Sequence, residues 1–170
     1  RPASVSVRED GSAYVAAFAG GEIVILDANG RVERTLRGGL RGLDRPFACL
    51  ELPGDQGPVL AVSEYGANRV LLLDGAGRRI REIGAKGTGP GQLLGPQYLA
   101  SDGRGYLYVC DWGNSRVNKY DLEGNFVLQL GRGSSGGAPR LGGPTGIAVA
   151  PGRASSPGEI YVADRGRALI

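Results

Sequence analysis

Large side chains recur at one regularly spaced position of the chain, and their types suit the binding of a partner. The position is occupied in turn by Phe18, Tyr65, Trp112 and Arg165. Aromatic rings and arginine are typical anchors of protein interfaces, and aromatic rings also stack on unpaired bases. Trp112 is the only tryptophan in the chain, so it is the first candidate for an anchor. These positions predict a partner-binding surface. The alternative is that each ring merely covers the neighbouring unit of structure.

Arginine supplies the second set of candidate residues. Arg69 and Arg116 stand 47 residues apart at equivalent positions, and we predict that they bind the partner together with Tyr65, Trp112 and Arg165. A second interpretation makes Arg69 and Arg116 partners in surface ion pairs, which stabilise a fold by only about 0 to 1 kcal/mol each.

Further basic residues lie in the connections expected on the same face, where contact with RNA phosphates is an alternative to a protein partner. They are Arg37, Arg41, Arg45, Lys86, Arg132 and Arg140. Acidic residues share this neighbourhood, which weakens the case for RNA. They are Asp44, Glu64, Asp111 and Asp164. A protein partner is therefore the first expectation, and RNA remains the alternative.

The recurring acidic residues have a structural interpretation of their own. Asp111 and Asn114 are three residues apart at a predicted strand end, a spacing at which both side chains hydrogen-bond backbone in a turn. Glu64 and Asn68 form a variant of this motif, and Asp164 occupies the same position later in the chain. We expect these residues to stabilise turns rather than to bind a metal ion.

Composition argues against catalysis. The chain has no histidine, which removes the usual general base and the commonest metal ligand. Cys49 and Cys110 have no metal-ligand spacing. The glycine-rich run 131–137 has no following Lys-Ser or Lys-Thr, so it is a linker rather than a phosphate loop. We predict no catalytic residue, no metal and no cofactor in this chain.

A repeat organises the chain and sets where the candidate residues lie. The valine that closes one predicted strand recurs at intervals of 47, 47 and 53 residues, as Val15, Val62, Val109 and Val162. A period of about 40 to 50 residues is typical of propellers and solenoids. We predict one domain over residues 1–170. Its repeat units are 2–45, 46–95, 96–143 and an incomplete 144–170.

Each complete unit holds four short apolar runs that predict antiparallel strands. In the second unit they cover residues 47–52, 59–62, 69–73 and 79–83. The third and fourth runs are joined by tight-turn sequences in which glycine adopts positive φ, such as 74–77 and 121–124. The fold class is therefore all-β, built from four-stranded antiparallel sheets.

Two segments closely resemble the repeat of the NHL β-propeller family: residues 87–93 at the end of the second unit and residues 106–117 in the third, with Pro96 between them. The resemblance implies a β-propeller of which about three and a half blades are present. It is weak in the first unit, where Ala17 and Gly20 replace the acid and asparagine of the motif. Propellers close with four to eight blades. We therefore expect part of a larger propeller, closure with a second copy, or a trimmed chain.

The resemblance also implies a biological setting. NHL propellers often form the carboxy-terminal part of tripartite-motif proteins, which are similar to ubiquitin ligases that select substrates or messenger RNAs through this domain. We expect a non-catalytic recognition module in the cytoplasm, with any ligase activity in a part not present in these residues. The alternatives are a bacterial or extracellular sensor propeller for a small ligand and a metal-dependent lyase of the amidating type.

Overall fold

The computed structural model describes residues 1–39, 42–54, 57–131, 140–150 and 158–166. In this part of the chain, strands form three four-stranded sheets and one two-stranded sheet, all antiparallel. Its one helix is the short 3₁₀ helix η1 (Trp112–Asn114). The predicted all-β fold class is confirmed.

The strands follow one another in chain order within every sheet. The first sheet holds β1 (Pro2–Val7), β2 (Ala13–Ala17), β3 (Glu22–Leu26) and β4 (Val32–Leu36). The second holds β5 (Pro46–Leu52), β6 (Val59–Glu64), β7 (Arg69–Leu73) and β8 (Arg79–Ile83). The third holds β9 (Pro96–Ser101), β10 (Tyr106–Asp111), β11 (Arg116–Asp121) and β12 (Phe126–Gly131). The fourth holds β13 (Pro144–Ala150) and β14 (Glu159–Asp164).

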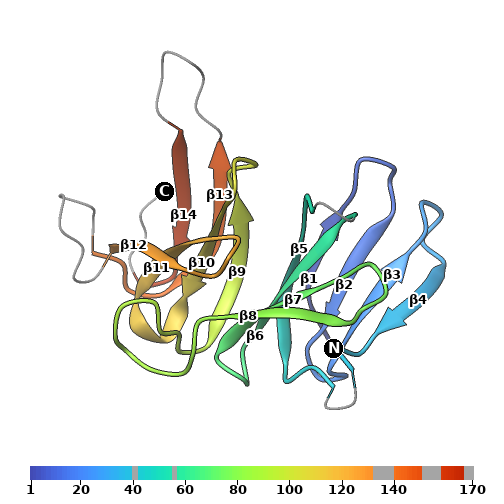
Figure 1. Cartoon of the computed structure of the whole chain (residues 1–170), viewed down its shortest axis with the longest axis horizontal. Coiled ribbons are helices and arrows are strands. Elements are labelled where there is room, and N and C mark those ends of the chain that lie inside the picture. Colours follow the sequence, from blue (N-terminus) through green and yellow to red (C-terminus); the bar gives the residue numbers. More distant parts are fainter. Residues whose placement is uncertain (40–41, 55–56, 132–139, 151–157, 167–170) are drawn as a thin grey trace.

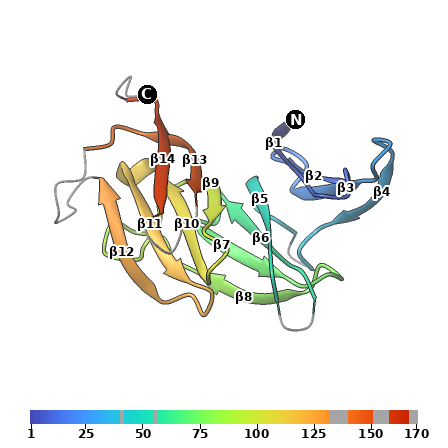
Figure 2. The same cartoon turned by 90° about the horizontal axis from the view of Figure 1, so that it is seen from above.

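The sheets are arranged as the blades of a partial β-propeller. Seen from above, they fan out in an arc with the first strand of each sheet on the inside (Figure 2). Each inner strand contacts the next, β1 with β5, β5 with β9 and β9 with β13. The arc stays open between the first and fourth sheets (Figure 2). Each predicted unit contains one of these sheets.

Packing between blades explains why β7 is apolar at four successive positions. In β7, Leu71 and Leu73 belong to the core between the first two sheets, whereas Val70 and Leu72 belong to the core between the second and third. Successive side chains of a strand point to opposite faces. A strand covered on both faces therefore needs apolar residues at every position. This accounts for the run Val70–Leu73, which is 0 to 4% exposed.

The hairpins between the third and fourth strands confirm the predicted turns. Gly30, Gly77 and Gly124 have φ of 77°, 81° and 89°, a region that glycine adopts without steric cost. An aspartate three residues earlier in each hairpin accepts a backbone N–H bond of 2.8 Å from the residue that follows the glycine. The three bonds have the same length because the three turns adopt the same conformation.

Antiparallel pairing brings two kinds of segment to one end of the sheets. These are the turns between second and third strands, at 18–21, 65–68 and 112–115, and the connections from each sheet to the next. They lie at the bottom of the view in Figure 1. We call this end the connection face, and the end that carries the hairpins the opposite face. Within the described residues, no helix has the length and apolar character needed to cross a membrane.

Candidate partner-binding face

Asp111 is the centre of a buried hydrogen-bond network below the connection face. Its side chain is 0% exposed. Oδ1 accepts a bond of 2.7 Å from the backbone N–H of Leu94, and Oδ2 accepts bonds of 2.8 Å from Asn114 and from Arg116. Burial raises the pKa of the Asp111 carboxyl, and these hydrogen bonds oppose that shift. The network ties the end of β10 to the connection that enters the same blade.

The same device recurs in the other blades that have an acid at this position. Glu64 accepts a 2.8 Å bond from the backbone N–H of Asp44, and Asp164 accepts one of 2.6 Å from that of Gly143. Asn68 accepts a 2.9 Å bond from the N–H of Gly95. The structural interpretation of the acidic motif is confirmed, but its partners differ from those expected. The three acids bind the connection that precedes their own blade. Asn68 instead bonds Gly66 in its own turn and Gly95 in the following connection.

Arg116 has a structural role, and its burial leaves the predicted contact with a partner without support. It is 4% exposed, and its guanidinium makes five hydrogen bonds of 2.7 to 3.2 Å within the chain. The acceptors are Asp111, Gln129 and the carbonyls of Thr88, Gly89 and Gln92. A guanidinium has five N–H donors. Its bonding capacity is therefore used inside the fold.

Arg69 occupies the equivalent place in the second blade and is more accessible. Its side chain is 22% exposed. Nε lies 2.6 Å from Glu64, and Nη1 lies 2.7 Å from Glu82. The expected pairs Arg69–Glu64 and Arg116–Asp111 both form, but both acids are 0% exposed, so these are not the surface ion pairs expected from the sequence.

The recurring aromatic residues form a row on the connection face. The ring centroids of Phe18 and Tyr65 are 5.8 Å apart, and those of Tyr65 and Trp112 are 6.5 Å apart, with interplanar angles of 57° and 44°. Phe18 and Tyr65 are half-buried, and Trp112 is 39% exposed. Register along the repeat thus brings together residues 47 positions apart in the sequence, as predicted.

Two further rings and one cation join this row. Sequence reasoning did not identify the two rings, and it named the cation, Arg45, only as a candidate contact to RNA phosphates. Phe47 lies 6.2 Å from Phe18 and 5.4 Å from Tyr98, centroid to centroid. The Arg45 guanidinium lies 5.4 Å from the centroid of the Tyr65 ring. Phe47 and Tyr98 follow the prolines that open their units, which was the available sequence signal. We define the aromatic row as Phe18, Phe47, Tyr65, Tyr98 and Trp112.

Each ring of the row also touches the neighbouring blade. A Cβ built on Gly95 would lie 2.9 Å from the Tyr65 ring, and one on Gly143 would lie 3.3 Å from Trp112 Nε1. These glycines directly precede β9 and β13. One side of the Tyr65 ring and one side of the Trp112 ring therefore cover the next blade, and Trp112 remains 39% exposed.

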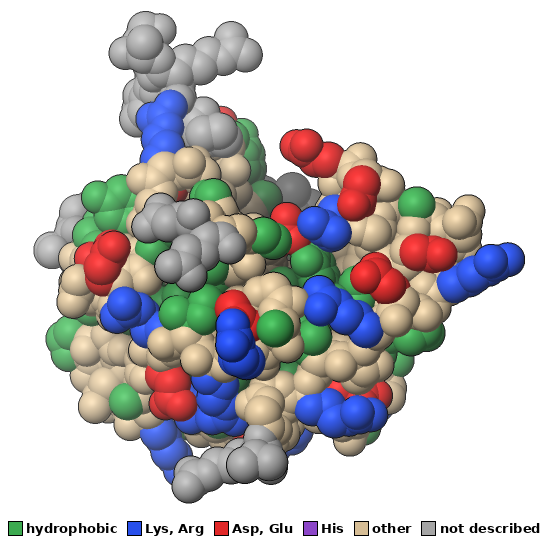
Figure 3. Space-filling view, turned by 45° about the vertical axis from the view of Figure 1, so that its right-hand side comes forward, with side chains coloured by type: hydrophobic (Ala, Val, Ile, Leu, Met, Phe, Trp, Pro, Cys, Tyr) green, Lys and Arg blue, Asp and Glu red, His purple; other side chains and the backbone are tan. Residues whose placement is uncertain are grey.

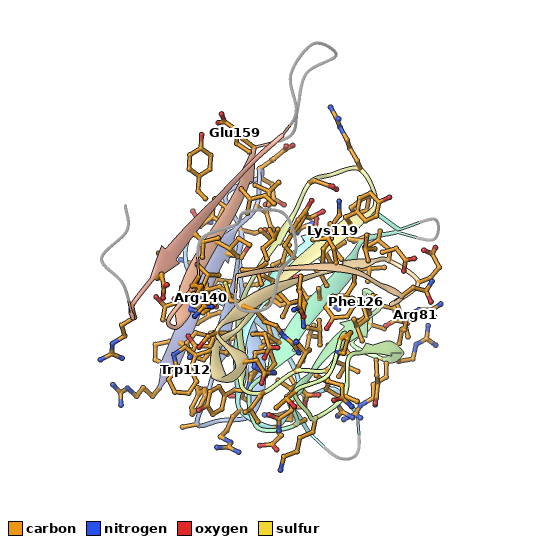
Figure 4. The ribbon with its side chains drawn as sticks, turned by 90° about the vertical axis from the view of Figure 1, so that its left-hand side faces the viewer. Arg81, Trp112, Lys119, Phe126, Arg140 and Glu159 are labelled. Atoms are coloured by element: carbon orange, nitrogen blue, oxygen red, sulfur yellow. The ribbon has the colours of Figure 1, made fainter. Side chains whose placement is uncertain are left out.

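The fourth member of the series, Arg165, is exposed and follows β14. Its backbone N–H donates a 2.9 Å bond to the carbonyl of Gly143, the residue against which Trp112 packs. Figure 4 shows Trp112 and Arg140 on the same side of the ribbon. Arg41 and Arg132, also expected on this face, lie outside the described residues, as does most of the 131–137 linker.

In the part of the chain that the structure describes, neither a metal-ligand cluster nor an exposed thiol competes with this face. Among the residues that the structure describes, no group of three or more His, Cys, Asp or Glu side chains is placed to hold a metal ion. Cys49 and Cys110 are free and buried, and burial raises the pKa of each thiol to about 12. On the side shown in Figure 3, basic and acidic side chains alternate with apolar ones.

The fold and this face define the class of protein, a segment of a β-propeller with a row of aromatic rings at one end. No protein-family model matches the sequence, and no curated protein matches it. Solved structures do match, and they are β-propeller proteins. A streptogramin B lyase matches with a TM-score of 0.66 at 15% identity, covering 94% of this chain and 54% of that chain.

Two solved complexes match over a similar extent. A nidogen/laminin complex has a TM-score of 0.66 at 18% identity, covering 97% of this chain and 57% of that chain. A complex of BBS1N with ARL6DN has a TM-score of 0.62 at 15% identity, covering 90% of this chain and 40% of that chain. The chain thus spans about half the length of the first and second of these three structures. The TM-scores of 0.62 to 0.66 show that these proteins share a fold with this chain, and at 15 to 18% identity the likeness extends to the fold alone.

Proposed function

We propose that this chain is a non-catalytic recognition module, an NHL-type propeller segment that binds a protein partner through its connection face. The observation that carries the proposal is the aromatic row. Its rings come from different blades, yet they stand within 5.4 to 6.5 Å of their neighbours. Clustered, partly exposed aromatic rings are typical of the anchors of protein interfaces.

At these turns, the residues that hold the connections differ from the residues proposed to bind the partner, and this supports the proposal. The buried acids Glu64, Asp111 and Asp164 hold the connections, so the residue that follows each acid is not needed for that purpose. A tryptophan that is 39% exposed at such a position leaves apolar surface in water. A partner that covers this ring removes the surface from water, which favours binding.

Two of the three structural neighbours described above support a binding role. Two of them were solved as complexes, nidogen with laminin and BBS1N with ARL6DN. The other is a lyase. Because this chain contains no histidine, we assign it no catalytic role. We further propose a cytoplasmic setting within a longer protein of the tripartite-motif type, where ligase activity belongs to another part. Two free, buried cysteines fit that setting.

The proposal is tested with Trp112→Ala. Random twelve-residue peptides displayed on phage are selected on the chain, and the recovered peptides are measured by fluorescence anisotropy. Loss of the indole is expected to weaken binding by about 2 kcal/mol, or about 30-fold in Kd. The melting temperature is expected to change little, because the ring is partly exposed.

Tyr161→Ala is the matched control. Tyr161 is 57% exposed on β14, outside the aromatic row, and its replacement is expected to leave Kd unchanged. If no peptide is recovered, or if Trp112→Ala binds the recovered peptides as well as the unchanged chain does, the proposed function is refuted. If Trp112→Ala unfolds the chain, the ring is part of the core and the proposed function is likewise refuted.

A further inference from the structure

The acidic residues of the connection face are mostly withdrawn from its surface. Glu64 and Asp111 are 0% exposed and Asp164 is 8% exposed, and each carboxylate accepts backbone N–H bonds. Glu64 and Asp111 are also neutralised by Arg69 and Arg116. Of the four acids that the sequence assigns to this face, only Asp44 remains exposed.

The basic residues of the same face remain exposed. Arg45, Lys86, Arg140 and Arg165 are all exposed, and within the described ranges the last three have no ion-pair partner. Arg37 is exposed as well and lies 3.2 Å from Glu22. The aromatic row is therefore accompanied by an excess of exposed positive charge. Counting the basic and acidic residues of the sequence does not reveal this excess, because the count does not show which acids are buried.

Arg45 occupies a position at which the next two units have glycine. It directly precedes β5, as Gly95 precedes β9 and Gly143 precedes β13. Its φ is 53° and that of Gly95 is 59°, a conformation that residues with a Cβ rarely adopt. Unfavourable backbone at a surface position points to a role beyond folding. The guanidinium lies over Tyr65, in the middle of the row.

We propose that the partner is an acidic peptide segment. Its apolar side chain contacts Tyr65 and Trp112, and its carboxylates lie opposite Arg45 and Arg165. This inference rests on the proposed function, because it names the chemistry of the partner at the same face. Charge complementarity accelerates association and excludes partners of the wrong sign. Arginine also binds carboxylates in bidentate geometry.

The tilt of the rings favours a peptide over RNA. Neighbouring rings of the row are inclined by 57° and 44°, and Tyr65 and Trp112 each have glycine packed against one side. Successive stacked bases need ring faces that are open. An apolar peptide side chain fits between inclined rings without that requirement.

The test compares defined probes by fluorescence anisotropy. Four labelled probes are used: a twelve-residue peptide with Glu and Asp around a central Phe, the same peptide with Ala for Phe, a Lys analogue of the first, and a single-stranded RNA of similar length. The acidic Phe peptide is expected to bind most tightly, and its Kd is expected to rise between about 50 and 200 mM salt. The Ala peptide is expected to bind about tenfold more weakly.

Two variants test whether Arg45 and Arg165 contribute to binding of the acidic peptide. Arg45→Gly and Arg165→Ala are each expected to raise the Kd of the acidic peptide about threefold. Arg45→Gly is also expected to raise the melting temperature, because glycine fits the positive φ at this position. Arg31→Ala is the control, since it removes an exposed arginine from a hairpin on the opposite face and is expected to leave Kd unchanged.

The inference is overturned if the Lys peptide or the RNA binds more tightly than the acidic peptide. It is also overturned if the acidic peptide fails to bind up to about 1 mM, or if Arg45→Gly and Arg165→Ala leave its Kd unchanged. If selected peptides bind with dependence on Trp112 and without preference for acidic residues, the inference fails and the proposed function stands. If no bound peptide depends on Trp112, both fail.

Discussion

Replacement of Arg116 by alanine is expected to lower the free energy of unfolding by about 3 to 5 kcal/mol. Arg116 is 4% exposed, and Asp111 beside it is 0% exposed. Without the guanidinium, the Asp111 carboxylate stays buried with neutral donors only. Three carbonyls of the preceding connection each lose one donor as well, those of Thr88, Gly89 and Gln92. Those of Gly89 and Gln92 retain a second donor, the N–H of Gln92 and the amide of Asn118. Breaking a buried pair from one side therefore costs far more than breaking a surface pair.

The measurement is urea unfolding followed by circular dichroism, with two comparison variants. Arg31→Ala removes an exposed arginine and is expected to change stability by less than about 0.5 kcal/mol. The double variant Asp111→Ala with Arg116→Ala leaves no buried charge. It is therefore expected to be less destabilised than the sum of the two single variants, by about 1 to 3 kcal/mol. Amide hydrogen exchange is expected to accelerate over residues 87–95.

A loss below about 1 kcal/mol for Arg116→Ala would refute this reasoning, because it would place the guanidinium in water rather than in a buried network. Additive effects of Asp111→Ala and Arg116→Ala would refute it as well. Additivity would mean that the two side chains do not stabilise each other.

Three other properties follow from the turns and the thiols. Gly124→Val is expected to destabilise by more than about 1 kcal/mol, because φ at this position is 89°; an unchanged melting temperature would contradict this. With pKa values of about 12, Cys49 and Cys110 are expected to resist Ellman's reagent at about pH 8 until urea is added; reaction in the folded state would show exposed thiols. Hydrogen bonds from the backbone and side chain of Arg78 lower the pKa of Asp74 from its ordinary value of 3.8. This contribution to stability is present above that value and is lost as the pH falls through the lower, folded-state pKa, so Asp74→Asn is expected to reduce the decline of stability measured between about pH 5 and pH 2. If the stability of Asp74→Asn declines equally over this pH range, Asp74 is not the source of the decline.

The fold was predictable because its information is local and repeated. The four strands expected in the second unit agree with β5 to β8 to within two residues at each end. Short apolar runs and tight turns recur in each unit, so one unit supports the interpretation of the next. The row of Phe18, Tyr65 and Trp112 was predictable for the same reason, since equivalent positions of a repeat share a face.

The burial of Arg116 was not predictable, because its acceptors lie 24 to 28 residues earlier along the chain in a glycine-rich connection. No local pattern shows that this connection folds back over the strand. The charge of the connection face was misjudged for the same reason, since Glu64 and Asp111 lie below it. Arg45 was detectable in principle, because it replaces the glycine that precedes the opening proline in the next two units.

The buried acids have a consequence for how this protein changes over evolutionary time. Because Glu64, Asp111 and Asp164 fasten the connections, the adjacent residues are not needed to hold those connections in place. That freedom is visible in the chain itself, where the adjacent positions hold tyrosine, tryptophan and arginine on the same scaffold. A new partner specificity is therefore reachable by single substitutions at these positions, without passing through unstable intermediates.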